Sequence, residues 1–78
     1  MAYYEYSINI DDNDYVYGRG DGEYDDVEDE LRRLVEYLKG NSTIDFIKYD
    51  IRERHIGLAL NRVARRGPKG WTDSPATH

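Results

Sequence analysis

The chain has 78 residues, no cysteine and a formal net charge of −5 at pH 7. This length corresponds to one domain near the lower limit for a single hydrophobic core. The lack of cysteine excludes disulfides and cysteine-bound metals as stabilising elements. The first residues lack the basic and apolar regions of a signal peptide, and no apolar run could cross a bilayer, so we expect a cytoplasmic protein.

The charges are unevenly distributed along the chain. Residues 1–31 contain eleven of the sixteen acidic side chains but only one of the eleven basic ones, Arg19. The first part therefore carries −10, and residues 32–78 carry +5. An uneven charge distribution of this kind creates an electric field that selects charged partners and speeds their capture. The acidic part is therefore expected to bind a basic surface.

The first strand is predicted over residues 3–10, where apolar and polar side chains alternate as in a half-buried strand. The acidic residues 11–14 predict a turn. Residues 15–17 are then expected to form a short second strand that pairs with the first. The three glycines within residues 18–22 predict a flexible loop.

Residues 25–39 show the most regular apolar pattern. Apolar side chains recur there at spacings of three and four, which predicts an amphipathic helix. Asp25 and Glu28 have the spacing of a capping box, and Gly40 is placed to end the helix. Acidic residues crowd the first turns, where the helix dipole favours them.

The second half of the chain begins with another alternating segment, residues 46–52, which predicts a strand. Residues 54–66 fit either a further strand or a second helix. Gly57 would cost a helix about 1 kcal/mol relative to alanine, which favours the strand. Residues 67–78 contain glycines and prolines and are expected to form a flexible, disordered tail.

These elements predict an α+β fold in the order β-(β)-α-β-β. One amphipathic helix would pack on one face of a three- or four-stranded antiparallel sheet, with residues 1–66 as the single domain. Burial yields about 1.5–3 kcal/mol for each large apolar side chain against a similar or larger entropy cost, so dimerisation would help so small a core. The expected core residues are Tyr4, Tyr6, Ile8, Ile10, Val27, Leu31, Leu34, Leu38, Ile47, Tyr49, Ile51, Ile56, Leu58 and Leu60.

No catalytic or metal-binding motif has the spacing that its chemistry needs. The glycines of residues 18–22 precede a helix, as in a phosphate-binding loop, but Glu23 stands where the dinucleotide motif needs glycine. The aspartates of residues 11–21 lack the register of an EF-hand, and two histidines without clustered carboxylates do not make a zinc site. We therefore expect a non-enzymatic protein that binds no cofactor or metal ion.

The expected function is protein binding by the acidic segment, which also holds six of the eight tyrosines. It would occupy the basic surface of another protein in place of DNA, and by analogy of size and charge alone such inhibitors occur in phages and mobile elements. Exposed charges would steer association, and desolvated tyrosines would supply the binding energy. The expected partner-binding residues are Asp12, Asp14, Tyr15, Tyr17, Asp21, Glu23, Tyr24, Asp25, Asp26 and Asp29.

An alternative function is nucleic-acid binding by the basic C-terminal segment. This segment combines cations for phosphate groups with an aromatic ring for stacking. The overall acidity of the chain argues against direct contact with nucleic acid, because the −10 part would repel the same polymer. The residues of this alternative site are Arg62, Arg65, Arg66, Lys69 and Trp71.

Overall fold

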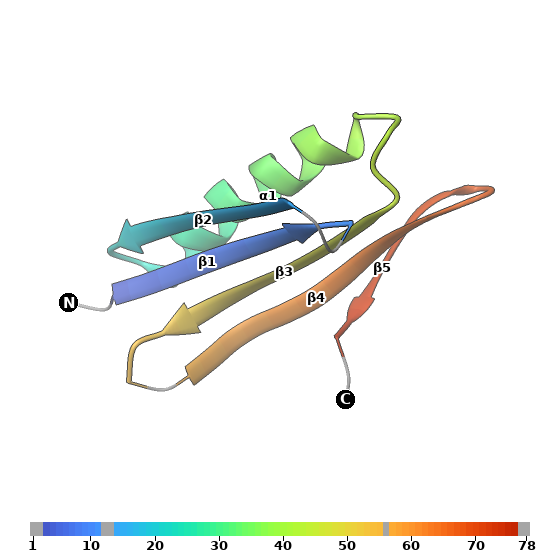
Figure 1. Cartoon of the computed structure of the whole chain (residues 1–78). Coiled ribbons are helices and arrows are strands. Elements are labelled where there is room, and N and C mark those ends of the chain that lie inside the picture. The colour runs from blue at the N-terminus through green and yellow to red at the C-terminus, as the bar shows by residue number, and fades with distance from the viewer. Residues whose placement is uncertain (1–2, 12–13, 56, 77–78) are drawn as a thin grey trace.

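The computed structural model describes residues 3–11, 14–55 and 57–76, with only the backbone described for residues 14, 17, 20 and 21. In this part of the chain, one helix packs on a five-stranded antiparallel sheet (Figure 1). The α+β class and the predicted order of the first five elements are confirmed, and a fifth strand follows them. The elements are β1 (Tyr3–Ile10), β2 (Asp14–Asp21), α1 (Tyr24–Lys39), β3 (Phe46–Glu53), β4 (Gly57–Gly67) and β5 (Gly70–Pro75).

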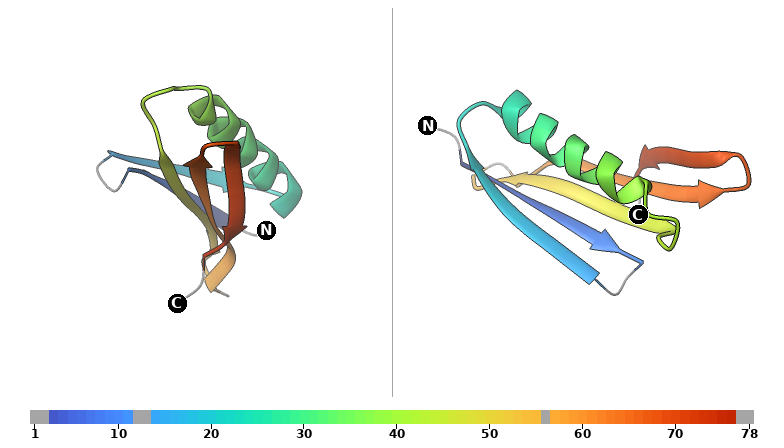
Figure 2. Two further views of the ribbon diagram at one scale, coloured as in Figure 1. Left: turned by 90° about the vertical axis from the view of Figure 1, so that its right-hand side faces the viewer. Right: turned by 90° about the horizontal axis from the view of Figure 1, so that it is seen from above.

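The strands lie side by side in the order β2-β1-β3-β4-β5, and each neighbouring pair is antiparallel. The helix covers one face of this sheet, and the β4–β5 hairpin curls toward the end of the helix on the same side (Figure 2). No other described element covers the opposite face. We call the two sides of the sheet the helix face and the uncovered face.

The second strand is longer than the sequence predicts. β2 pairs with β1 over its whole length, so residues 18–21 form a strand and not the predicted flexible loop. The ring of Tyr6 packs directly against Gly18, at a position where any side-chain carbon would collide with the ring. The glycine is needed here for close approach, which is a recognised reason for glycine within a strand.

The helix begins one residue earlier than predicted. Glu23 is the N-cap residue and forms no side-chain capping hydrogen bond, so the predicted capping box of Asp25 and Glu28 is wrong. Asp25 lies within the first turn, where the helix dipole still favours its charge. The predicted end is confirmed, since the N–H of Gly40 donates to the carbonyl of Tyr37 at 3.2 Å.

The strand predicted within residues 54–66 is confirmed as β4, and the alternative second helix is wrong. A bulge next to residues 51–52 of β3 leaves Ala59 without a partner there, between the paired residues Leu58 and Leu60. Because successive residues of a strand point to opposite faces, this extra residue turns Leu58 to the uncovered face. Leu58 is 49% exposed, so its predicted place in the core is wrong.

The predicted disordered tail is also wrong for the described residues up to Ala76. β5 pairs with β4, with Trp71 opposite Arg66. The turn between the two strands includes Gly70, whose φ of +116° is readily adopted only by glycine. The glycines and proline that suggested disorder instead form this hairpin turn, and residues 77–78 lie outside the described residues.

The core lies between α1 and the helix face of the sheet. Most of the predicted core residues are buried there, namely Tyr6, Ile8, Ile10, Val27, Leu31, Ile47, Tyr49 and Ile51. Four others lie partly buried at its margin, namely Tyr4, Leu34, Leu38 and Leu60. Ile56 lies outside the described residues. The core also includes three residues that were not predicted, namely Val35, Ile44 and Ala64.

Candidate functional site

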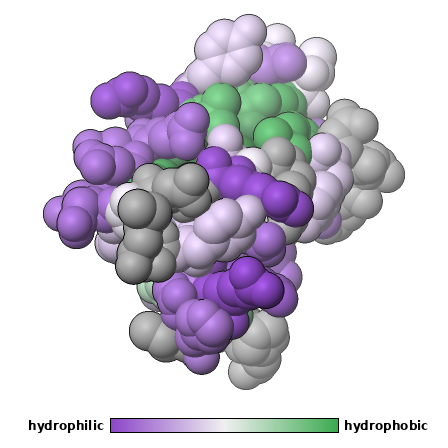
Figure 3. All heavy atoms as spheres, turned by 90° about the vertical axis from the view of Figure 1, so that its left-hand side faces the viewer, coloured by the Kyte–Doolittle hydropathy of each residue, from purple (hydrophilic) through white to green (hydrophobic). Residues whose placement is uncertain are grey.

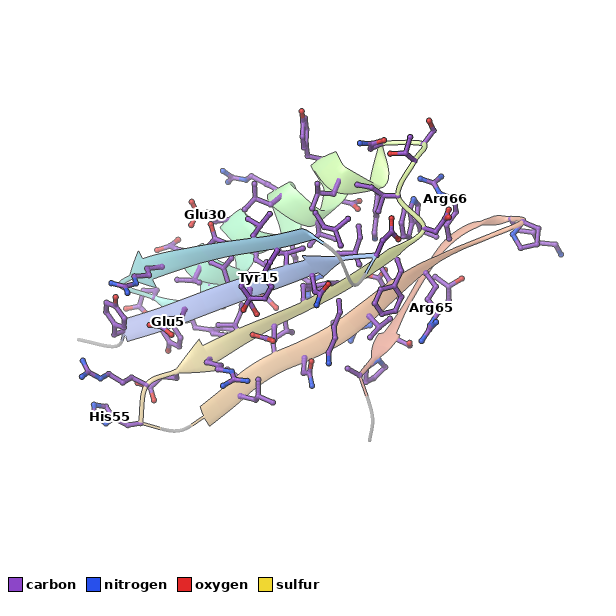
Figure 4. The ribbon with its side chains drawn as sticks, viewed as in Figure 1. Glu5, Tyr15, Glu30, His55, Arg65 and Arg66 are labelled. Carbon is purple, nitrogen blue, oxygen red and sulfur yellow. The ribbon has the colours of Figure 1, made fainter. Side chains whose placement is uncertain are left out.

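The two sides of the sheet present different side chains. Figure 4 shows Tyr15 and Arg65 on the uncovered face, whereas Glu30 and Arg66 lie on the helix side. The pairing register agrees with this view, because the cross-strand partners of Tyr15 and Arg65 alternate with buried residues along β1 and β3. Candidate binding surfaces are therefore best assigned by face.

Carboxylates gather over the N-cap and the first turns of α1. Within the described residues, only Glu28 among them forms an ion pair, with an oxygen 3.1 Å from a guanidinium nitrogen of Arg32. The other five are exposed. Figure 3 views the molecule from the end where β2 leads into α1 and shows mostly hydrophilic side chains around an apolar patch. We call the group the acidic cap, and its residues are Glu23, Asp25, Asp26, Glu28, Asp29 and Glu30.

The structure divides the predicted partner-binding residues into separate groups. The four charged residues at the start of the helix lie together in the acidic cap, namely Glu23, Asp25, Asp26 and Asp29. Three others lie along the backbone of β2, namely Asp14, Tyr17 and Asp21. Asp12 lies outside the described residues. Among the described side chains, the structure therefore brings the four carboxylates of the acidic cap together.

The remaining two predicted tyrosines have different surroundings. Tyr24 is half-buried, and its ring packs edge-on against Tyr4 with 5.7 Å between the ring centroids. Burial, followed by the nearby charge of Glu28, raises the pKa of the Tyr24 hydroxyl. Tyr15 lies on the uncovered face toward the other end of β2 and is 62% exposed. The two rings do not share one surface.

Two residues of the alternative nucleic-acid site are used inside the protein. The guanidinium of Arg66 lies 4.6 Å from the ring centroid of Trp71 and donates to the carbonyls of Ile44 at 2.9 Å and Asn41 at 2.8 Å. The indole N–H of Trp71 donates to the carbonyl of Lys39 at 3.1 Å. Both side chains thus fasten the β4–β5 hairpin to the end of α1 and the loop that follows.

The other three residues of that site lie in different places. Arg62 lies beside the Tyr49 hydroxyl on the helix face. Arg65 lies on the uncovered face, 4.9 Å from the ring centroid of Phe46. Lys69 is exposed in the turn between β4 and β5. The five residues do not form one surface that could follow a nucleic-acid strand.

A polar cluster joins β3, β5 and the end of α1. The hydroxyl of Tyr49 donates to Oδ2 of Asp73 at 2.9 Å, and Nζ of Lys39 lies 3.0 Å from Oδ1 of the same carboxylate. Burial alone would raise the pKa of Asp73, but the hydrogen bonds from Lys39 and Tyr49 outweigh it and lower this pKa. The carboxylate is therefore held in its charged form and ties the three elements together.

A groove crosses the uncovered face. It consists of three adjoining hollows of about 490, 410 and 300 Å³. The first and second share Glu5 and Arg52, and the second and third share Lys48. We call this continuous hollow the sheet groove. It extends from the β3–β4 turn, across the middle of the sheet, to the end of β5.

Among the described side chains that line the sheet groove, cations outnumber carboxylates, although the chain is negatively charged. Its three carboxylates belong to Glu5, Asp50 and Glu53. Aromatic residues also line it, and those of them whose side chains are not buried are Tyr3, Tyr15 and Phe46. Its five cationic side chains are Arg19, Lys48, Arg52, Arg54 and Arg65. This surface was not predicted because its cations come from β2, β3, the β3–β4 turn and β4 and are brought together only by strand pairing.

The residues that the structure describes include one histidine, His55. His55 is exposed in the β3–β4 turn, where its backbone N–H donates to Oε2 of Glu53 at 3.0 Å. No group of three histidine or carboxylate side chains in residues 3–11, 14–55 and 57–76 could hold a metal ion. No helix within these residues is long and apolar enough to cross a membrane.

Comparison with known proteins gives no matching family model, no curated protein with significant similarity and no solved structure with significant similarity.

Proposed function

We propose that this protein is a non-enzymatic binding module whose acidic cap docks on a basic surface of another protein. The proposal rests on one observation, namely that the protein itself leaves most of the negative charge of the acidic cap without a positively charged partner. Within the described residues, five of the six carboxylates of the acidic cap form no ion pair. Their mutual repulsion opposes folding, and a basic partner would relieve it on binding.

The shape of this surface supports a partner that normally binds nucleic acid. The carboxylates cluster at the N-cap and over the first turns of a helix, which presents concentrated negative charge as a DNA backbone does. A protein with a basic groove for DNA or RNA offers the complementary surface. The module would then act as an inhibitor that occupies this groove in place of nucleic acid.

Tyr37 is the aromatic anchor that best suits this surface. It is 81% exposed and lies on α1. Asp26, Glu30, Arg33 and Tyr37 follow one another at spacings of four, three and four, so they share one side of the helix. Exposed charges mainly set the rate of association, and a desolvated aromatic ring supplies holding energy. Tyr37 was not among the predicted partner-binding residues, although its place opposite the apolar stripe of the helix can be seen in the sequence.

Two matched charge reversals test the proposed function. Asp26→Lys changes the acidic cap, whereas Glu36→Lys makes the same charge change on α1 outside it. Immobilised wild type and both variants are used to capture proteins from a cell extract, and association with the captured protein is then measured. We expect wild type and E36K to retain the same basic protein, with association of D26K slowed about tenfold at low salt. Equal binding by D26K, or capture of no basic protein, would contradict the proposal.

A further inference from the structure

The sheet groove forms a second surface, on the opposite side of the sheet from the acidic cap. We propose that this groove binds single-stranded nucleic acid, with its cations contacting phosphates and its rings stacking on bases. The inference goes beyond the docking of the acidic cap and does not depend on it. Charge complementarity identifies the occupant. Among the described side chains of the groove, five are cationic and three are carboxylates, in a protein whose net charge is −5.

The carboxylates of the groove are largely engaged with the protein itself. Asp50 accepts a hydrogen bond from the hydroxyl of Ser7 at 2.9 Å. Glu53 is buried and accepts the backbone N–H of His55 at 3.0 Å. In contrast, Lys48 and Arg52 form no ion pair or side-chain hydrogen bond within the described residues. These two cations are available to an anionic ligand.

The aromatic rings indicate a single strand rather than a duplex. Tyr15 is largely exposed on the uncovered face, and Phe46 lies under the guanidinium of Arg65. Stacking on such rings requires bases whose faces are free, which duplexes do not offer. An arginine beside an aromatic ring adds a cation–π contact to the same platform. A flexible single strand can also follow the groove past the middle of the sheet.

The fold distributes the charges differently from the sequence. Along the chain the acidic and basic side chains separate into a first and a second part, whereas in the fold they separate by face. Arg65 is the only residue of the alternative nucleic-acid site that lines the sheet groove. The acidic cap lies on the helix and does not line the groove.

Fluorescence anisotropy with labelled oligonucleotides tests the proposal. Oligo-dT and oligo-U of roughly 16 nucleotides, a length at the upper end of known single-strand site sizes, are compared with a duplex of equal length. The measurement starts at low salt, about 50 mM, and is repeated up to about 200 mM. We expect the single strands to bind more tightly than the duplex and affinity to fall steeply with salt. A wild-type protein that binds no single strand at low salt would overturn the proposal.

Two pairs of variants locate the binding surface. Arg52→Gln removes a charge from the groove, and Arg33→Gln removes the same charge from the exposed side of α1. R52Q should reduce the slope of log affinity against log salt by about 0.7, the value expected for one phosphate contact. R33Q should leave binding unchanged. Equal effects of R52Q and R33Q would show that binding is not confined to the groove and would overturn the proposal.

Tyr15→Ala and Tyr37→Ala form the second pair, since both rings are exposed and only Tyr15 lines the groove. Y15A should weaken binding about five- to 150-fold, as expected for one lost base stack, while Y37A should not. Unfolding curves of all four variants must match wild type. Sedimentation tests whether a second copy of the chain occupies this face instead. A wild-type dimer that R52Q or Y15A converts to a monomer would assign the face to that second copy and overturn the proposal.

Discussion

Gly18 shows how one missing side chain shapes the packing of a strand. Within a run of alternate glycines it suggests flexibility, yet in β2 it lies directly against the Tyr6 ring. The ring fills the space above the glycine and covers part of the core margin. The missing side chain is therefore a packing requirement that comes from a residue twelve positions away.

Gly18→Ala should destabilise the fold because the added methyl group collides with the Tyr6 ring and forces it to move. We expect a loss of about 1–3 kcal/mol in the free energy of unfolding, as for other overpacked sites. Gly67→Ala is the control, since its nearest contact would be at an ordinary 3.6 Å. Urea unfolding measures both variants. A G18A protein as stable as wild type would contradict this account of the strand.

Asp73 is the residue that joins α1 to the C-terminal hairpin through a charge. Its folded-state pKa is lowered by Lys39 and Tyr49 against the opposing effect of burial. A carboxylate with a lowered folded pKa stabilises the protein fully above its ordinary value of 3.8. This contribution is lost as the pH falls through the lower folded pKa.

Asp73→Asn should therefore remove part of the acid dependence of stability. At neutral pH we expect D73N to lose about 1–2 kcal/mol, because hydrogen bonds to a charged group are replaced by weaker ones. The stability difference between D73N and wild type should shrink as the pH falls below 3.8. Asp45→Asn, at an exposed ion pair with Arg66, should have little effect at any pH. Thermal unfolding between neutral pH and pH 3 checks these outcomes, and a constant difference would count against the assignment.

At the scale of elements, the helix and strands with a regular spacing of apolar residues were the ones that the sequence predicted. β1, β3 and α1 have clear periods of two or about 3.6, and each was located within a residue or so of its observed bounds. β5 and the length of β2 were not predicted, because glycine and proline have the same local signature in a hairpin turn and in a disordered tail. The bulge in β4 changed which residues face the core, and it arises from pairing with β3 rather than from any local pattern.

The β4–β5 hairpin is held to the rest of the molecule by a few contacts around Trp71. Trp71→Ala removes the hydrogen bond to the Lys39 carbonyl and the ring beneath Arg66. Because Trp71 is only half-buried, we expect the free energy of unfolding to fall by about 2–3 kcal/mol. This lies at or below the lower end of the range for truncation of a tryptophan in a core. Hydrogen exchange should quicken in β5 more than in β1. Thr72→Ala, at an exposed neighbouring residue, is the control. An equal increase in hydrogen exchange across the whole sheet would contradict the role of Trp71 in fastening the hairpin.

At the scale of the whole molecule, the fold separates charges that the sequence mixes. The predicted residues Glu23, Asp25, Asp26 and Asp29 lie close together because they follow one another at the N-cap and in the first turns of one helix. The sequence could not group the cations of the sheet groove, most of which come from strands joined only by long-range pairing. Tyr15 and Tyr24 were assigned to one surface, although sheet register and helix packing direct them to different sides.

We expect the acidic cap to be the protein-docking surface, a claim that a nuclear magnetic resonance footprint tests. The basic protein captured by the wild type is added to the ¹⁵N-labelled chain, and changes in amide signals are followed residue by residue. Docking by the acidic cap predicts the largest changes over residues 23–37, including Tyr37, with those of β3 unaffected. Largest changes along residues 46–53 of β3, with the helix unaffected, would contradict the claim.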